Sequence, residues 1–222
     1  MKNDHLDMDR TRSELLAAIK PHVPFDGWSE PAFKLAVSDL GLDPGLARVV
    51  CPRGAVDLAV AYHREGDAAM LKRLEEADLS GMKFRDRIAT AVRFRLEEAD
   101  PELVRRGAAI FALPQNATTG SKLIWETSDK IWRALGDVSE DYNWYTKRMT
   151  LSGVYSSTVL YWMGDESEGK GDTWAFLDRR IEDVMQFEKV KGAAMKLPFL
   201  PKLLGGIRAP KGTDDMPGRE AH

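Results

Sequence analysis

The chain has 222 residues, of which 43% are hydrophobic, so it is long enough to bury a substantial core in one or two domains. It carries 32 basic and 35 acidic side chains, and the resulting net charge of −3 argues against a protein that binds nucleic acid through bulk positive charge. The single cysteine, Cys51, excludes an internal disulfide and a cysteine zinc cluster. The sequence has no run of roughly 18 apolar residues that would span a bilayer.

The first ten residues, MKNDHLDMDR, lack the apolar stretch of a secretion signal and are too acidic for a transit peptide. We therefore expect a cytoplasmic protein whose residues 1–8 are disordered.

The rest of the chain shows helical periodicity without the alternation that half-buried strands require, which predicts an all-α protein of about nine helices. The expected helices cover residues 10–20, 30–40, 44–50, 54–77, 83–99, 101–113, 118–135, 139–163 and 172–191. The second and third are separated by a tight turn at Gly41, which is the outline of a helix-turn-helix.

Polar residues just before several of these helices are expected to cap them, because such side chains accept hydrogen bonds from the first free backbone N–H groups. The expected caps are Ser29, Asp43, Asp100, Ser139 and Asp172, and Gly136 is expected at the C-terminal end of a helix. We divide the chain into a helix-turn-helix-like subdomain (9–53), a helical bundle (54–191) and a tail (192–222) that is disordered at its end.

The segment 137–163 contains two aromatic residues framed by an acid and a base at helical spacing. Asp141, Trp144, Tyr145 and Arg148 fall at i, i+3, i+4 and i+7, which places them on one face of a helix. Such a face suits a protein contact, since Trp, Tyr and Arg bury much area and keep a polar group. Packing of the same stripe into the core is the alternative interpretation.

The tail combines apolar and basic side chains and has no acidic residue between 189 and 211. This composition is typical of a segment that associates with an anionic membrane surface. The expected membrane-binding residues are Lys196, Leu197, Phe199, Leu200, Lys202, Leu203, Leu204, Ile207 and Arg208. Two prolines and the pair Gly205–Gly206 interrupt a continuous helix here.

The sequence offers little support for DNA reading or catalysis. The helix expected at 44–50 presents only Arg48 to a groove, and residues 29–50 are net negative. The four histidines are scattered, there is no Glu-x-x-His pair, and nucleotide-binding and serine-nucleophile motifs are missing. We expect no catalytic residue, no cofactor and no metal.

Several motifs carry a family resemblance that extends over roughly residues 10–195. They are DYNWYTKRMTLSGVYSSTVLYW (141–162), WSEPAFKLAVSDLGLDPGLARVVCPRGAVDL (28–58), RRGAAIFALPQN (105–116) and DTWAFLDRRIEDVMQFEKVK (172–191). In these motifs the chain resembles the lipid-binding accessory proteins of ubiquinone (coenzyme Q) biosynthesis, found in mitochondria and related proteobacteria. That family is similar in fold to TetR regulators.

The resemblance implies an isoprenoid lipid or ubiquinone precursor in the bundle, with the apolar residues that face inward on the predicted helices as its walls. These residues are Met70, Leu74, Phe84, Ile88, Val92, Phe111, Leu113, Leu123 and Trp132. An ordinary packed core is the alternative, because no sequence pattern separates a lined cavity from a filled one.

The resemblance further implies a peripheral position on the phospholipid surface at the inner face of the cytoplasmic membrane. It also implies a homodimer through the helices at 139–163 and 172–190, although the apolar seams of these helices are equally compatible with a core within one chain. The resemblance further implies contact with the demethoxyubiquinone hydroxylase through Asp141, Trp144, Tyr145 and Arg148. A TetR-like DNA-binding transcriptional regulator with a lipophilic effector pocket is the alternative function.

Overall fold

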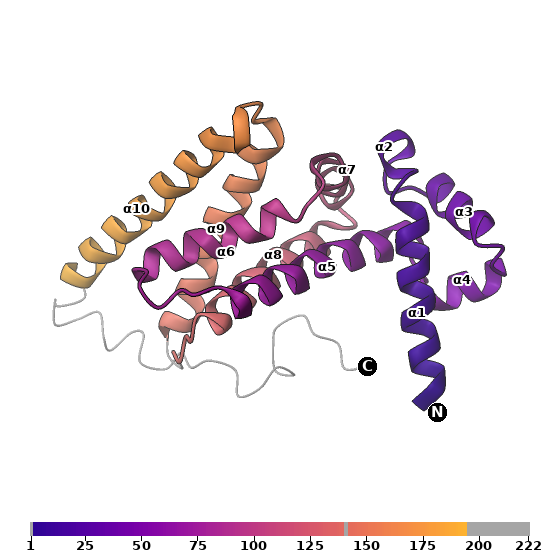
Figure 1. Ribbon diagram of the computed structural model, residues 1–222, viewed down its shortest axis with the longest axis horizontal. Coiled ribbons are helices and arrows are strands. Elements are labelled where there is room, and N and C mark those ends of the chain that lie inside the picture. The colour runs from indigo at the N-terminus through magenta and orange to yellow at the C-terminus, as the bar shows by residue number, and fades with distance from the viewer. Residues whose placement is uncertain (1, 140–141, 195–222) are drawn as a thin grey trace. The chain divides into compact units, whose positions relative to one another are not determined.

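The computed structural model describes residues 2–139 and 142–194 (Figure 1). Over these residues it contains helices and no strand, which confirms the all-α prediction. The elements are α1 (Lys2–Ile19), α2 (Val23–Asp26), α3 (Glu30–Asp39), α4 (Pro44–Val50), α5 (Ala55–Glu76), α6 (Phe84–Glu97), α7 (Pro101–Phe111), α8 (Ala117–Ala134), α9 (Tyr142–Gly164), the 3₁₀ turn η1 (Glu168–Lys170) and α10 (Gly171–Ala194).

Two differences from the predicted elements lie at the N-terminal end. Helix α1 begins at Lys2, whereas the sequence predicted disorder over residues 1–8. The short helix α2 was not predicted, because Pro24 was interpreted as a helix breaker. Pro24 instead lies in the first turn of α2, where its missing N–H needs no partner.

Three of the predicted N-caps are confirmed. Ser29 Oγ accepts a hydrogen bond from the N–H of Ala32 at 3.3 Å, and Asp43 Oδ1 accepts one from Leu46 at 2.8 Å. Asp100 Oδ1 accepts from the N–H groups of Glu102 and Leu103 at 2.8 and 3.1 Å.

The predicted cap at Asp172 is wrong, whereas the predicted cap at Ser139 adjoins residues 140–141, which lie outside the described ranges. The hydroxyl of Ser139 donates to Asp137 at 2.8 Å. Asp172 lies inside the first turn of α10, and the capping carboxylate is that of Asp165, which accepts from the N–H of Thr173 at 2.9 Å. Hydrogen bonds from Ser167 and Thr173 hold the pKa of Asp165 well below its ordinary value.

The described chain divides into two compact units. Unit 1 comprises the residues up to 69 and residues 97–123, and unit 2 comprises residues 70–96 and the residues from 124 onward. This division differs from the predicted boundary at residue 53, because α7 belongs with the helix-turn-helix region. Arg106 donates to the carbonyl of Pro24 at 2.8 Å, and the indole of Trp28 donates to the carbonyl of Leu103 at 3.1 Å.

Unit 1 has an apolar core around α1, α3 and α4. Leu15, Ile19 and Ala36 are fully buried there, and Phe33 is nearly so. The turn between α3 and α4 closes at Gly41, whose positive φ of 58° is accessible to glycine without strain.

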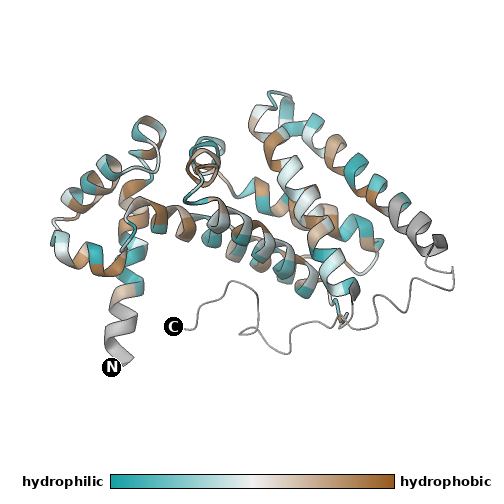
Figure 2. Ribbon diagram, turned by 180° about the vertical axis from the view of Figure 1, so that it is seen from behind, coloured by the Kyte–Doolittle hydropathy of each residue, from teal (hydrophilic) through white to brown (hydrophobic). Residues whose placement is uncertain are grey.

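In unit 2, α9 and α10 are joined by η1 and pack against each other. The rings of Tyr161 and Phe176 stack between them at a centroid distance of 4.6 Å. Figure 2 shows hydrophilic and hydrophobic residues alternating along α10, and its hydrophobic residues Leu177 and Ile181 are buried. No helix in the described ranges has the length and apolar character needed to cross a membrane.

Candidate functional site

A pocket of about 490 Å³ lies within unit 2, between α6, α8, α9 and α10. This volume is within the range of roughly 300–1,000 Å³ that is usual for small-molecule sites. The lining residues are Phe84, Ile88, Trp132, Gly136, Asp137, Val138, Ser139, Asn143, Thr146, Lys147, Thr150, Leu151, Val154, Ile181 and Val184.

Most of the lining is apolar, and it comes from four helices. The rings of Phe84 in α6 and Trp132 in α8 stack at a centroid distance of 5.4 Å. Leu151 and Val154 follow each other at i and i+3 on α9, so one face of that helix carries both toward the pocket. Ile181 contributes in the same way from α10.

The polar lining residues gather on the α8–α9 connection and the first turns of α9. Ser139 lies on the connection, and Asn143, Thr146, Lys147 and Thr150 lie on α9. The face of α9 toward the pocket therefore changes from polar to apolar along the chain. An amphiphilic molecule matches such a lining, with its polar end toward residues 139–147.

The α8–α9 connection starts from a defined helix end at Gly136. The N–H of Gly136 donates to the carbonyl of Arg133, and the N–H of Asp137 donates to that of Trp132, both at 3.0 Å. This is the Schellman arrangement, and the φ of 82° at Gly136 confirms the predicted C-terminal glycine. It directs the chain so that residues 136–139 line the pocket.

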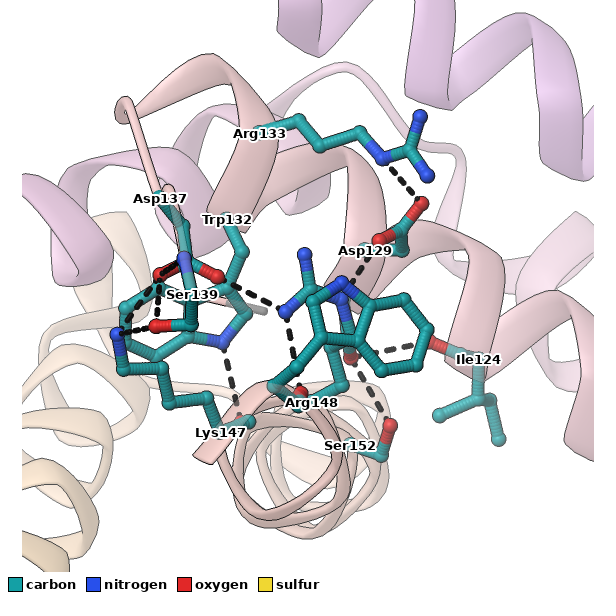
Figure 3. Close-up of polar contacts among 11 residues, drawn as sticks. Ile124, Asp129, Trp132, Arg133, Asp137, Ser139, Lys147, Arg148 and Ser152 are labelled. Carbon is teal, nitrogen blue, oxygen red and sulfur yellow. Dashed lines mark hydrogen bonds and ion pairs between the residues drawn. The ribbon is translucent and has the colours of Figure 1, made fainter. Parts of the chain in front are cut away.

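A buried ion-pair cluster holds this connection against α8 and α9 (Figure 3). Arg148 lies between two carboxylates, with Nε 2.6 Å from Asp129 Oδ1 and Nη1 2.9 Å from Asp137 Oδ2. The Arg148 side chain is 1% exposed and that of Asp137 is 3% exposed. Arg133 Nε binds the second oxygen of Asp129 at 2.8 Å. A buried arginine requires such partners, because an unpaired charge in the interior is strongly destabilising.

Lys147 connects this cluster to the pocket. Its Nζ donates to Asp137 Oδ1 at 2.7 Å and to Ser139 Oγ at 2.6 Å, and it lies 5.1 Å from the centroid of the Trp132 ring. The Trp132 indole N–H donates to the carbonyl of Lys147 at 3.0 Å. These contacts fix both a wall residue and the cation beside it.

The cluster keeps Asp137 ionised. Burial alone would raise the pKa of this carboxyl, but hydrogen bonds from Lys147, Arg148 and Ser139 outweigh burial and lower the pKa to about 2. Asp137 is therefore a fixed anion that is neutralised by its neighbours, and it is not a proton donor near neutral pH.

The predicted wall residues fall into three groups. Phe84, Ile88 and Trp132 line the pocket, although Phe84 is 43% exposed and was predicted to face fully inward. Met70, Leu74 and Val92 are buried in unit 2 but do not line the pocket.

The third group lies in unit 1. Phe111 packs against the unit 1 core, and Leu123 is buried. Leu113 is 45% exposed, so its predicted inward orientation is wrong. It lies beyond the end of α7, where the helical periodicity used to orient it no longer holds.

The predicted contact face on α9 is only partly exposed. Trp144 is 7% exposed and packs against Trp125 and Tyr145, with the Arg148 guanidinium 4.1 Å from its ring centroid. The expectation that Trp144 and Arg148 lie at the surface is therefore wrong, and these two residues follow the alternative interpretation of packing into the core, because a buried carboxylate pair draws Arg148 inward. Tyr145 is partly exposed, and Asp141 lies outside the described residues.

Three functional candidates were missed from the sequence, namely Asp129, Asp137 and Lys147. Their pairing joins α8, the connection and α9, and helical spacing does not reveal contacts across elements. The available signal was Arg148 itself, because an arginine on an otherwise apolar helix face requires a nearby carboxylate.

The helix-turn-helix presents an apolar surface where a regulator would present polar and basic groups. Leu46 and Val49 of α4 are 45% and 66% exposed, and Arg48 pairs with Glu30.

Within the described part of the chain, no group of three or more His, Cys, Asp and Glu residues could hold a metal ion. All of the predicted membrane-binding residues, Lys196 to Arg208, lie outside the described ranges.

Parts of this sequence match known proteins. Residues 117–188 match the COQ9 family model, and this stretch contains every lining residue of the pocket except Phe84 and Ile88. The chain is similar in sequence to the COQ9 proteins. It is 31% identical over 193 residues to the mitochondrial ubiquinone biosynthesis protein COQ9 of Rattus norvegicus, covering 83% of this chain and 62% of the rat protein.

A second COQ9 relative, from Drosophila melanogaster, is 30% identical over 187 residues, covering 82% of this chain and 57% of the fly protein. The chain thus spans about 60% of the length of the COQ9 proteins it matches. Among solved structures, a TetR transcriptional regulator from Nitrosomonas europaea ATCC 19718 aligns with a TM-score of 0.64 at 19% identity, covering 78% of this chain and 97% of the regulator. This likeness confirms the expected TetR-like fold.

Proposed function

We propose that the protein is a non-catalytic accessory protein of ubiquinone biosynthesis that binds isoprenoid quinone intermediates in the pocket of unit 2. The observation that carries the proposal is the position of this pocket, which lies almost entirely within the stretch that matches the COQ9 family model. The relatives named above are ubiquinone biosynthesis proteins, which supplies the substrate class.

The lining supports an isoprenoid ligand in particular. Leu151, Val154 and Ile181 provide apolar wall for a branched hydrocarbon chain, and the stacked rings of Phe84 and Trp132 provide a flat surface. A volume of about 490 Å³ holds a head ring and the first part of a polyprenyl chain, so the remainder of a long chain extends beyond the pocket.

We further propose that the tail, residues 192–222, brings the protein to the cytoplasmic face of an anionic membrane. Its basic and apolar composition supports this, since each Lys or Arg near such a surface contributes about 1 kcal/mol. Deleting residues 195–222 is expected to abolish sedimentation with phosphatidylglycerol vesicles. A truncated protein that still sediments with them would contradict the membrane role.

The bound lipid is presented to the demethoxyubiquinone hydroxylase in this proposal, with Tyr145 as the direct contact. Trp144 acts from beneath, because it is buried and packs edge-on against Tyr145, and Arg148 lies over the Trp144 ring. Tyr145→Ala is expected to weaken hydroxylase binding about tenfold. Phe25→Ala, at an aromatic residue of α2 that is 84% exposed, is the control that retains binding.

We propose a homodimer through α9 and α10. Met149 and Leu160 of α9 are 65% and 66% exposed, which is a large apolar exposure for one helix. Light scattering of the wild type and of Leu160→Lys tests this assembly, and the variant is expected to be a monomer.

Mass spectrometry of organic extracts from the purified protein tests the lipid proposal. The wild type is expected to release an isoprenoid quinone or a precursor. Val154→Trp, which places an indole in the pocket, is expected to release far less. Extracts without isoprenoid from a folded wild type would overturn the proposal.

A further inference from the structure

The ion-pair cluster beside the polar end of the pocket contains more positive than negative side chains. The cluster in Figure 3 contains three cations, on Arg133, Lys147 and Arg148, and two carboxylates, on Asp129 and Asp137. One net positive charge therefore remains after the ion pairs are formed. Arg148 is almost fully buried and Arg133 lies on the Asp129 side, so Lys147 is the cation of the cluster that lines the pocket.

Asp137 also lines the pocket, but its charge is already compensated. Oδ1 accepts from Lys147 and from the Ser139 hydroxyl, at 2.7 and 2.8 Å, and Oδ2 accepts from Arg148 at 2.9 Å. A carboxylate with several donors repels a second anion much less than a free one does, because its charge is shared among those donors. The rim is therefore compatible with an anionic head group.

Lys147 retains capacity for a ligand. An ammonium group has three N–H bonds, and the contacts found within the described residues use two of them, to Asp137 and Ser139. The side chain is 36% exposed and lines the pocket, so a ligand in the pocket can approach it. The surrounding contacts with Trp132 and Ser139 hold the ammonium in place before a ligand arrives, which lowers the ordering cost of binding.

We propose that this pocket selects amphiphiles whose head carries an anionic oxygen, on a carboxylate, phenolate or phosphate, and that Lys147 binds that oxygen. The inference rests on the proposed lipid function and specifies the head of the ligand. The hydrocarbon chain runs from Lys147 past Leu151 and Val154 toward Ile181. A neutral quinone oxygen accepts the same hydrogen bond more weakly, because it lacks the charge.

Matched pairs of ligands test the preference in binding titrations. The first pair is farnesyl-substituted 4-hydroxybenzoate and its methyl ester, and the second is farnesyl monophosphate and farnesol. The wild type is expected to bind the anionic member of at least one pair about tenfold more tightly, which corresponds to one charge-assisted hydrogen bond. The pair that shows the larger preference tells whether the head is a ring carboxylate or a phosphate.

Three variants assign the preference to its residue. Lys147→Met is expected to bind both members of a pair alike, and Lys147→Arg is expected to restore the preference. Lys72→Met makes the same charge change at an exposed position in unit 2 away from the pocket, and is expected to leave it unchanged. Urea unfolding midpoints close to that of the wild type show that the variants are folded.

Two outcomes overturn the inference and leave the proposed function standing. In one, the wild type binds the members of each pair equally well. In the other, Lys147→Met keeps the full preference. If the folded wild type binds none of the four ligands, the proposed lipid function itself fails.

Discussion

The helix-turn-helix region of unit 1 has a filled apolar interior, whereas the pocket region of unit 2 has an open space with buried charges beside it. Around α1, α3 and α4 the interior is filled by apolar side chains such as Leu15 and Ile19, which are fully buried. Between α6, α8, α9 and α10 a space of about 490 Å³ remains, and charged groups are buried beside it. One region is optimised for packing, whereas the other gives up packing to leave room for a ligand.

An ion pair of unit 1 and those of Arg148 in unit 2 also differ, because the former is exposed and the latter are buried. In unit 1 the pair Arg48–Glu30 lies at the surface, where ion pairs contribute little. In unit 2 the pairs of Arg148 are buried and hold the connection that lines the pocket. In unit 2, buried ion pairs therefore hold the α8–α9 connection beside the pocket, where apolar contacts are missing.

We expect removal of the buried ion pairs of unit 2 to lower the free energy of unfolding far more than removal of an exposed pair of unit 1. Arg148→Met leaves the carboxylates of Asp129 and Asp137 buried without their shared partner, and we expect a loss of roughly 3–5 kcal/mol in the free energy of unfolding. Arg48→Met in unit 1 removes an exposed pair and should cost less than about 1 kcal/mol. Urea denaturation of both variants measures the difference, and equal losses would show that Arg148 is not the stabilising centre of unit 2.

A second comparison concerns exposed and buried aromatic residues. Trp144→Ala is expected to destabilise by about 3 kcal/mol, because the indole packs against Trp125 and Arg148. Phe25→Ala should have almost no effect, since Phe25 in α2 is 84% exposed. Thermal unfolding followed by circular dichroism checks both values. A stable Trp144→Ala protein would restore the interpretation of Trp144 as a surface contact.

The pH dependence of stability provides a third, smaller effect. The folded-state pKa of Asp137 is lowered from 3.8 to about 2, so its contribution is complete above about pH 4 and disappears as the pH falls through 2. The contribution corresponds to roughly 2 kcal/mol. We expect Asp137→Asn to be less stable than the wild type at pH 6 by this amount.

The difference between wild type and Asp137→Asn should shrink steadily between about pH 4 and pH 2. Urea unfolding at several pH values measures it. Asp178→Asn is a suitable control, because Asp178 is an exposed carboxylate of α10 outside the cluster. A difference for Asp137→Asn that stays constant down to pH 2 would mean that the carboxylate is not ionically bound.

A larger side chain is expected to cost less stability at the pocket of unit 2 than in the filled core of unit 1. Ala47 in α4 is fully buried, so Ala47→Leu forces extra atoms into a packed interior and should cost about 1–3 kcal/mol. Val154→Trp adds more atoms, yet it should cost less, because Val154 borders the pocket. Equal or greater destabilisation by Val154→Trp would indicate that the pocket is not open to an added side chain.

Local features of the fold could be predicted from the sequence, and long-range ones could not. The caps Ser29, Asp43 and Asp100 and the helix end at Gly136 were predictable, because each depends on hydrogen bonds within a few residues. The choice between a surface and a core position for Trp144 and Arg148 could not be made from the sequence, because it depends on Asp129, which lies 19 residues before Arg148 on another helix.

The pocket shows the same limit. Phe84, Ile88 and Trp132 were predicted from inward-facing periodicity, but the same criterion also selected Met70 and Val92, which are simply buried. Whether an inward side chain borders a cavity or another side chain depends on the packing of several helices at once.

Isothermal titration calorimetry with a farnesyl-substituted benzoquinone measures whether the hollow of unit 2 holds an isoprenoid amphiphile. The wild type is expected to bind one molecule per chain with a negative heat-capacity change, because apolar surface is buried. Val154→Trp, shown to be folded, is expected to bind none. Saturable binding that is identical in the two proteins would contradict the account, since it would place the ligand outside this pocket.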